Sequence, residues 1–110
     1  RGCFSPSESG WDCHAARLGS ILVRPPVFIG FYDGGPTHLE NYEEKTGIAV
    51  STDLRRWHRI SVDAPAIVSP HGTGSLRYID PIELPGETRF YYEYARADGA
   101  HELRLNIVKQ

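Results

Sequence analysis

The sequence contains no methionine and only two cysteines, Cys3 and Cys13, among its 110 residues. Because no initiator methionine is present, we expect a processed, trimmed or fragmentary chain. Two cysteines do not supply the four closely spaced ligands of a structural zinc site. They either pair as a disulfide that closes a short N-terminal loop or remain as two thiols. Since that choice depends on the redox compartment, the localisation stays open.

The chain also lacks an excess of charge and any long apolar run. Lysine and arginine number 12, and aspartate and glutamate number 14, which gives a net charge of −2. This balance offers no electrostatic basis for binding nucleic acid or an anionic membrane. No apolar run approaches the ~20 residues that a membrane-spanning helix requires. The hydrophobic content of 40% nevertheless supports a folded core.

The best-defined local pattern is a hairpin over residues 46–61. Ile48 and Val50 alternate with small or polar residues, which predicts a half-buried strand. Ser51 and Asp53 predict a tight turn, because their side chains can bond to nearby backbone amides. Trp57 then supplies the large apolar anchor of the hairpin, and the strand resumes at residue 60.

Short strand-like runs surround this hairpin, and no sustained period of 3.6 residues is present. We therefore predict an all-β fold with no helix longer than about two turns. Two runs precede the hairpin and three follow it, which predicts one four-stranded antiparallel meander and a second with three strands. The runs cover residues 17–23, 26–33, 76–84, 89–95 and 102–108.

A weak internal repeat relates the two halves of the chain. Residues 16–22 resemble residues 76–82, so that Arg17 and Arg77 lie 60 residues apart. Repeats of roughly 40–60 residues indicate the four-stranded blades of a β-propeller. We therefore expect about two blades. The predicted parts are an N-terminal arm (residues 1–14), a first blade (residues 15–62) and an incomplete second blade (residues 63–110).

Polar residues gather in loops that a meander would bring to one end. Four of the five histidines lie in these loops, together with many isolated acids. Loops collect polar residues in any fold, so a purely structural role is the alternative. The polar side chains of these loops suit hydrogen bonding to a polyhydroxylated ligand, or acid–base catalysis by paired carboxylates. The loops comprise residues 10–14, 33–44, 70–74 and 96–101.

The predicted site combines two candidate acids with a set of binding residues. We expect them to line one shallow polar site, with the loop of residues 37–45 at its rim. The recurring arginines could instead only brace one blade against the next. The candidate acids are Asp12 and Asp80, and the binding residues are His14, Arg17, Asp33, Glu43, Arg77, Tyr78 and His101.

Several motifs resemble the blades of five-bladed β-propeller glycoside hydrolases of the arabinanase, xylosidase and invertase-like group. They are Tyr-Asp-Gly at residues 32–34, Ser-Thr-Asp-Leu-Arg-Arg-Trp at residues 51–57, and the segments at residues 11–20 and 76–80. The resemblance implies the last two blades of a ring, with Arg17, Tyr78 and Asp80 at funnel-lining positions. In that group the catalytic acids usually lie in the first three blades, so no acid or base is carried over.

Two functional hypotheses follow. The first is a glycoside hydrolase-like fragment that binds a sugar and hydrolyses it with paired carboxylates when the parent or an assembly is complete. The second is a non-catalytic carbohydrate-binding or self-associating β module. We expect no cofactor, with a structural calcium ion as the alternative. We expect as further partner either a second copy or the remaining blades, because two sheets cannot bury all the aromatic residues between them. Those residues are Phe28, Phe31, Phe90, Tyr92 and Tyr94.

Overall fold

The computed structural model describes residues 4–37 and 43–109, and none of them lies in a helix. The predicted all-β class is therefore confirmed for the described chain, which also holds no helix able to cross a membrane. The described residues form seven strands: β1 (Ala15–Arg24), β2 (Val27–Gly35), β3 (Lys45–Ser51), β4 (His58–Arg59), β5 (Leu76–Leu84), β6 (Glu87–Ala95) and β7 (His101–Lys109).

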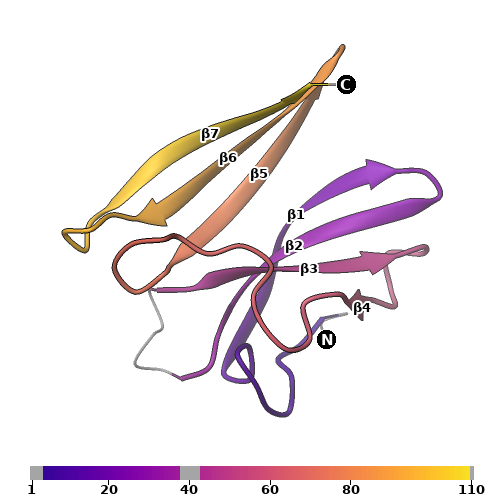
Figure 1. Cartoon of the computed structure of the whole chain (residues 1–110). Coiled ribbons are helices and arrows are strands. Elements are labelled where there is room, and N and C mark those ends of the chain that lie inside the picture. The colour runs from indigo at the N-terminus through magenta and orange to yellow at the C-terminus, as the bar shows by residue number, and fades with distance from the viewer. Residues whose placement is uncertain (1–3, 38–42, 110) are drawn as a thin grey trace.

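The strands form two antiparallel sheets of consecutive neighbours. The first sheet has the order β1-β2-β3-β4 and the second has the order β5-β6-β7. The prediction of a four-stranded and a three-stranded meander is confirmed, and neither sheet closes on itself. Figure 1 shows β5 beside the first sheet, whereas β7 lies at the far edge of the second sheet.

The predicted turn of the hairpin is confirmed in detail. The Ser51 hydroxyl oxygen accepts hydrogen bonds from the amides of Asp53 (3.2 Å) and Leu54 (2.9 Å). The Asp53 carboxylate accepts from the amides of Arg55 and Arg56, both at 2.8 Å. These amide donors lower the pKa of Asp53 to about 2.

The second strand of the hairpin is shorter than the sequence predicts. β4 comprises only two residues, although the amide of Ile60 still donates to the carbonyl of Ile48 at 2.8 Å. The ladder ends early because the chain then leaves the sheet: Ser61 uses its hydroxyl group, as well as its own amide, to bond to the backbone of Ile48.

The hydrophobic core lies between the two sheets. Leu22 and Phe31 of the first sheet meet Leu76 and Ile79 of the second. Phe31 and Phe90 pack edge to face, with ring centroids 6.0 Å apart, which is a favourable aromatic geometry. Further side chains packed on this core are Ile29, Ile48, Phe90, Tyr92 and Tyr94. Most of the aromatic residues expected to remain uncovered therefore contribute to the contact between the sheets.

The N-terminal arm covers the opposite face of the first sheet. Trp11 stacks on Tyr32 with centroids 5.5 Å apart, and its indole N–H donates to the carbonyl of Ser61 at 2.9 Å. A glycine is required beneath these rings, since a Cβ at Gly47 would lie 2.4 Å from the Tyr32 ring. Trp57 lies against Gly30 in the same first sheet, as its predicted anchoring role requires.

The internal repeat of the sequence has a structural counterpart. β2 and β6 have equal lengths, and each residue of β2 lies 60 positions before its equivalent in β6. The register of β1 against β2 is irregular between Leu18 and Ser20, and that of β5 against β6 between Arg77 and Asp80. Because residues 18 and 20 correspond to residues 78 and 80 at this offset, both sheets carry a bulge at the same place.

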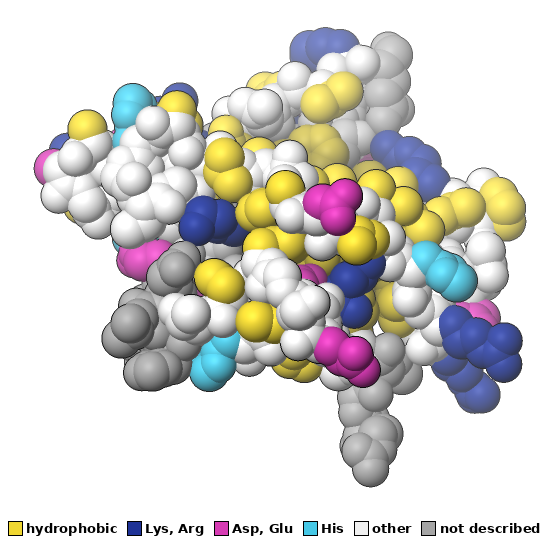
Figure 2. All heavy atoms as spheres, turned by 60° about the horizontal axis from the view of Figure 1, so that its bottom comes forward, with side chains coloured by type: hydrophobic (Ala, Val, Ile, Leu, Met, Phe, Trp, Pro, Cys, Tyr) yellow, Lys and Arg dark blue, Asp and Glu magenta, His cyan; other side chains and the backbone are white. Residues whose placement is uncertain are grey.

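The surface retains many large hydrophobic side chains. In Figure 2 hydrophobic side chains extend across the middle of the face shown, and charged side chains interrupt them. Fourteen large hydrophobic residues of the described chain are exposed, many of them in β5 and β7.

Candidate functional site

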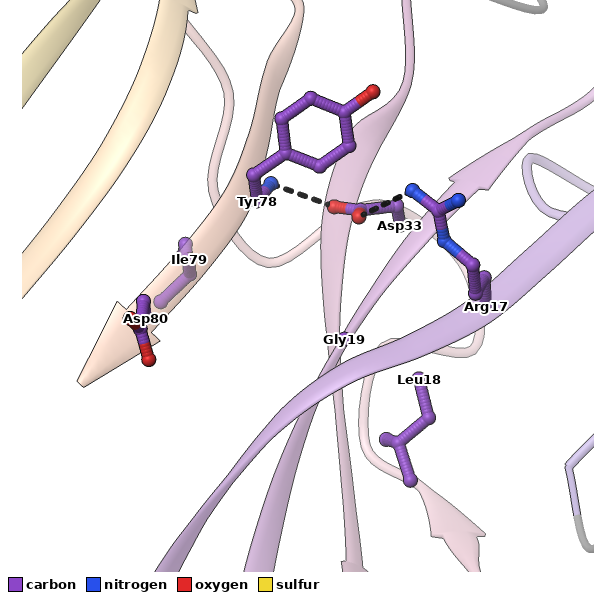
Figure 3. A pocket seen from close by; sticks show the side chains of 7 residues that line it. All are labelled: Arg17, Leu18, Gly19, Asp33, Tyr78, Ile79 and Asp80. Carbon is purple, nitrogen blue, oxygen red and sulfur yellow. Dashed lines mark hydrogen bonds and ion pairs between the residues drawn. The ribbon is translucent and has the colours of Figure 1, made fainter.

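A pocket of about 440 Å³ opens where the two sheets meet, at the bulges of β1 and β5. Four predicted site residues contribute to it: Arg17 from β1, Asp33 from β2, and Tyr78 and Asp80 from β5. Figure 3 shows these side chains with the remaining lining residues, Leu18, Gly19 and Ile79. The structure therefore brings together residues that are up to 63 positions apart in the sequence.

Asp33 is the buried acid of this pocket, with 5% of its surface exposed. Its carboxylate accepts a hydrogen bond from the amide of Tyr78 at 3.0 Å and lies 3.6 Å from the guanidinium of the exposed Arg17. Burial raises the pKa of Asp33, and the Tyr78 amide and Arg17 oppose this effect without cancelling it. Asp33 therefore holds its proton more strongly than an ordinary aspartate.

The raised pKa of Asp33 predicts a pH-dependent stability. The native state binds a proton that the unfolded state has released, so stability should fall as pH rises from the ordinary aspartate value through the raised native one. We expect the variant Asp33→Asn to lose this pH-dependent part of the stability. Urea unfolding between pH 3.5 and 7 measures the effect, and an unchanged pH profile in the variant would contradict it.

Tyr78 has an unusual backbone conformation at the bulge. Its φ is +60°, in the left-handed region that non-glycine residues rarely adopt. The amide that this conformation presents is the one that binds Asp33. The exposed ring lies 5.6 Å from the guanidinium carbon of Arg17 and 4.7 Å from that of Arg77, both within cation–π range. Backbone strain of this kind is concentrated at functional sites.

Asp80 supplies the exposed carboxylate of the pocket. In Figure 3 it lies farther along β5 than the group formed by Arg17, Asp33 and Tyr78. Within the described residues its side chain has no hydrogen bond or ion pair. It therefore remains available to a ligand.

Arg77 lies outside the pocket lining and acts as a brace. Its guanidinium pairs with Glu44, which precedes β3, at 3.1 Å and with Glu93 of β6 at 3.2 Å. Hydrogen bonds to these two acids raise the pKa of Arg77, although burial acts against them. This geometry agrees with the alternative stated from the sequence, in which Arg77 braces one blade against the next.

Asp12 is not brought into the pocket. It lies on the arm and is 1% exposed, and it accepts hydrogen bonds from the Tyr32 hydroxyl and the Arg59 Nε, both at 2.9 Å. Tyr32 points to the arm-covered face, whereas its neighbour Asp33 points toward the second sheet, because successive strand residues alternate. The expectation that Asp12 shares one open site with Asp80 does not match this arrangement.

The remaining predicted residues lie apart from the pocket lining. Glu43 accepts a hydrogen bond from the Thr73 hydroxyl at 2.7 Å and lies 3.4 Å from the Nε2 of His101, so two predicted residues form a separate polar cluster. His14 is exposed, and its amide donates to Gly35 at 3.0 Å.

Two further expectations depend partly on residues outside the described chain. Of the predicted rim loop, residues 38–42 lie there, as does Cys3. Cys13 is a free thiol whose sulfur donates to the carbonyl of Pro36 at 3.3 Å.

Sequence reasoning missed three lining residues, Leu18, Gly19 and Ile79. They occupy the two bulges, and nothing in their chemistry marks them. The internal repeat could have identified two of them, because the 60-residue offset aligns Gly19 with Ile79, close to the equivalent arginines Arg17 and Arg77. Within residues 4–37 and 43–109, no group of three or more acidic, histidine or cysteine side chains could hold a metal ion. The calcium ion stays a prediction.

The fold and site define an all-β chain of two antiparallel sheets with a polar pocket at their junction. No family model, curated protein or solved structure matches this chain.

Proposed function

We propose that this chain is a carbohydrate-binding part of a β-propeller, and that the pocket between β1 and β5 receives the sugar. The observation that carries the proposal is the convergence of Arg17, Asp33, Tyr78 and Asp80 on one pocket. Charged side chains offer strong hydrogen bonds to hydroxyl groups, and an aromatic ring offers apolar contact to a sugar's C–H groups. The volume of about 440 Å³ lies within the range of small-molecule sites.

The repeat supports the propeller architecture. Equivalent strands lie 60 residues apart, equivalent bulges occur in both sheets, and the first strands β1 and β5 are in contact. Side-by-side first strands are what radial repetition of a blade requires. The seven strands would then represent one complete and one incomplete blade.

Hydrolysis would use the two carboxylates of the pocket when the parent or an assembly completes the site. Asp33, whose pKa is raised by burial, is suited to donate a proton. Asp80 is exposed and would act as the second carboxylate. This assignment replaces the pair Asp12 and Asp80, because Asp12 is buried on the other face of the first sheet.

The second candidate is a non-catalytic sugar-binding or self-associating module. It is favoured by the extensive exposed hydrophobic surface of β5 and β7. Turnover of aryl-glycosides by the isolated chain would decide for the enzyme. Binding without turnover, measured on an assembly that completes the site, would decide for the module.

Sugar binding is tested by titrating the chain with pentose and fructose oligosaccharides in calorimetry. We expect weak, roughly millimolar binding. The variants Arg17→Gln and Asp80→Asn should each weaken it about tenfold, because each removes one charged partner of the ligand. Arg55→Gln, an exposed change in the turn after β3, is the matched control and should leave binding unchanged. Equal affinities in all four proteins would refute the pocket.

A further inference from the structure

A second pocket, of about 450 Å³, lies between the two sheets, and we call it the apolar pocket. Both sheets contribute aliphatic and aromatic side chains to its walls. Among the residues that line it, only Tyr92 and Asn106 carry a polar side-chain group, and none carries a charge. It shares a single lining residue, Ile79, with the polar pocket between β1 and β5, so the two pockets are separate sites.

The apolar pocket reaches from the surface to the hydrophobic core. The sheets pack together where β1 and β5 lie side by side, whereas β7 is the far edge of the second sheet (Figure 1). The floor of the pocket belongs to the core cluster, in which Leu22, Phe31 and Leu76 are 4–7% exposed. At its mouth lie Ile67 and Val108, which are 40% and 50% exposed. A molecule can therefore enter it from solvent.

The apolar pocket is larger than an ordinary packing defect. Protein interiors are packed as densely as organic crystals, and they contain few voids larger than a water molecule. An apolar cavity of ~150 Å³ already accepts benzene and stays free of water when it is empty. The apolar pocket is about three times as large and lies within the range of small-molecule sites. Its walls gain dispersion contacts when an apolar molecule fills it.

The lining of the apolar pocket favours a neutral, aromatic ligand. A charged group would lose its hydration there without gaining a charged partner, which is costly. Phe31 of the first sheet and Phe90 of the second both line the pocket, with ring centroids 6.0 Å apart, and the ring of Tyr92 is a further part of the wall. Aromatic rings pack favourably on one another in edge-to-face and offset arrangements. A flat ring system therefore suits this space.

Asn106 supplies the exposed hydrogen-bonding group of this pocket. Its Oδ1 accepts a hydrogen bond from the Tyr92 hydroxyl at 3.5 Å, which is long for such a bond. Among the described residues its side chain makes no other hydrogen bond, so the amide can still donate to a ligand. A hydroxyl group at one end of an aromatic ligand would bond to Asn106 while the rings lie between the sheets.

We propose that the apolar pocket binds a neutral aromatic molecule of about two fused rings that carries one hydroxyl group. The rings lie between Phe31 and Phe90 of the two sheets, and the hydroxyl group bonds to the Asn106 side chain at the mouth. The absence of charge in the lining, the aromatic walls and the single exposed amide define this class of ligand. The proposal is independent of whether the polar pocket between β1 and β5 binds a sugar.

Calorimetric titration with 2-naphthol tests the apolar pocket. We expect one molecule to bind per chain, with a Kd of roughly 100 µM for a ligand of this size. 2-Naphthalenesulfonate has the same rings with a fixed negative charge and should bind about tenfold more weakly or not at all. Val108→Trp should weaken 2-naphthol binding by about tenfold, because the indole ring occupies the mouth. Val62→Trp makes the same change at an exposed residue that does not line the pocket, and its affinity should be unchanged.

Asn106→Leu tests the hydrogen bond separately from the apolar contacts. It should weaken 2-naphthol binding roughly fivefold and leave naphthalene binding unchanged, because leucine has a similar size but no hydrogen-bonding group. The proposal is overturned if 2-naphthol does not bind, if the sulfonate binds as tightly, if Asn106→Leu binds 2-naphthol as tightly as the unmodified chain, or if the two tryptophan variants have equal affinities. Equal affinities would mean adsorption to the exposed hydrophobic surface. Near-UV circular dichroism checks the folding of each variant, and Ile67→Phe, also at the mouth, replaces Val108→Trp if that variant fails to fold.

Discussion

Replacement of Asp12 by asparagine is expected to lower the free energy of unfolding by about 2–3 kcal/mol. The carboxylate is 1% exposed and accepts hydrogen bonds from Tyr32 and Arg59, and the Arg59 guanidinium is itself largely buried. Asparagine can accept the same hydrogen bonds but removes the negative charge. The variant therefore leaves a mostly buried cation without its counter-ion.

The matched control for Asp12→Asn is Asp80→Asn. Asp80 is exposed, so its replacement should change stability by less than about 0.5 kcal/mol. Urea unfolding of both variants at pH 7 measures the difference. Comparable losses in the two variants would mean that Asp12 does not hold the arm on the sheet.

Truncation of Phe31 to alanine should cost about 3–5 kcal/mol. The ring is 7% exposed at the contact between the sheets and packs edge to face on Phe90. Its removal would leave a cavity in the small core that joins the two sheets. Thermal unfolding followed by circular dichroism measures the loss, and Phe31→Leu should recover a large part of it.

Tyr91→Ala is the repeat-matched control for Phe31→Ala. Tyr91 occupies the equivalent position in the second sheet, but no sheet of the described chain covers it. Its truncation should cost clearly less than that of Phe31 when both are measured on dilute, monomeric protein. Equal losses would show that the two sheets unfold independently and that their contact contributes little.

Only some of the predicted site residues line the pocket, and the packing of the two sheets on one another explains why. Arg17, Asp33, Tyr78 and Asp80 converge because β1 and β5 lie side by side and both carry a bulge. The prediction assigned the site to first-strand positions and to loops at the same end of the meander, and the residues that line the pocket all lie in strands. Glu43 and His101 do come together, as a separate cluster.

Local sequence determined the strands, because alternation, turn residues and breaks act over a few neighbours. The hydroxyl of Ser51 and the carboxylate of Asp53 fix their turn within residues 51–56, so that turn was predictable. The offset of 60 residues between Arg17 and Arg77 likewise indicated two related sheets. These features depend on residues close in the chain, or on a repeated pattern that is visible without coordinates.

Only the tertiary structure decided which polar side chains are buried and which are available. Asp12 and Asp80 are the same residue type beside or within a first strand, yet one is enclosed by the arm and the other is exposed. The difference arises from Tyr32 and Arg59, which lie 20 and 47 positions away from Asp12. Whether a charged side chain is buried depends on such distant partners, and the sequence around an aspartate does not identify them.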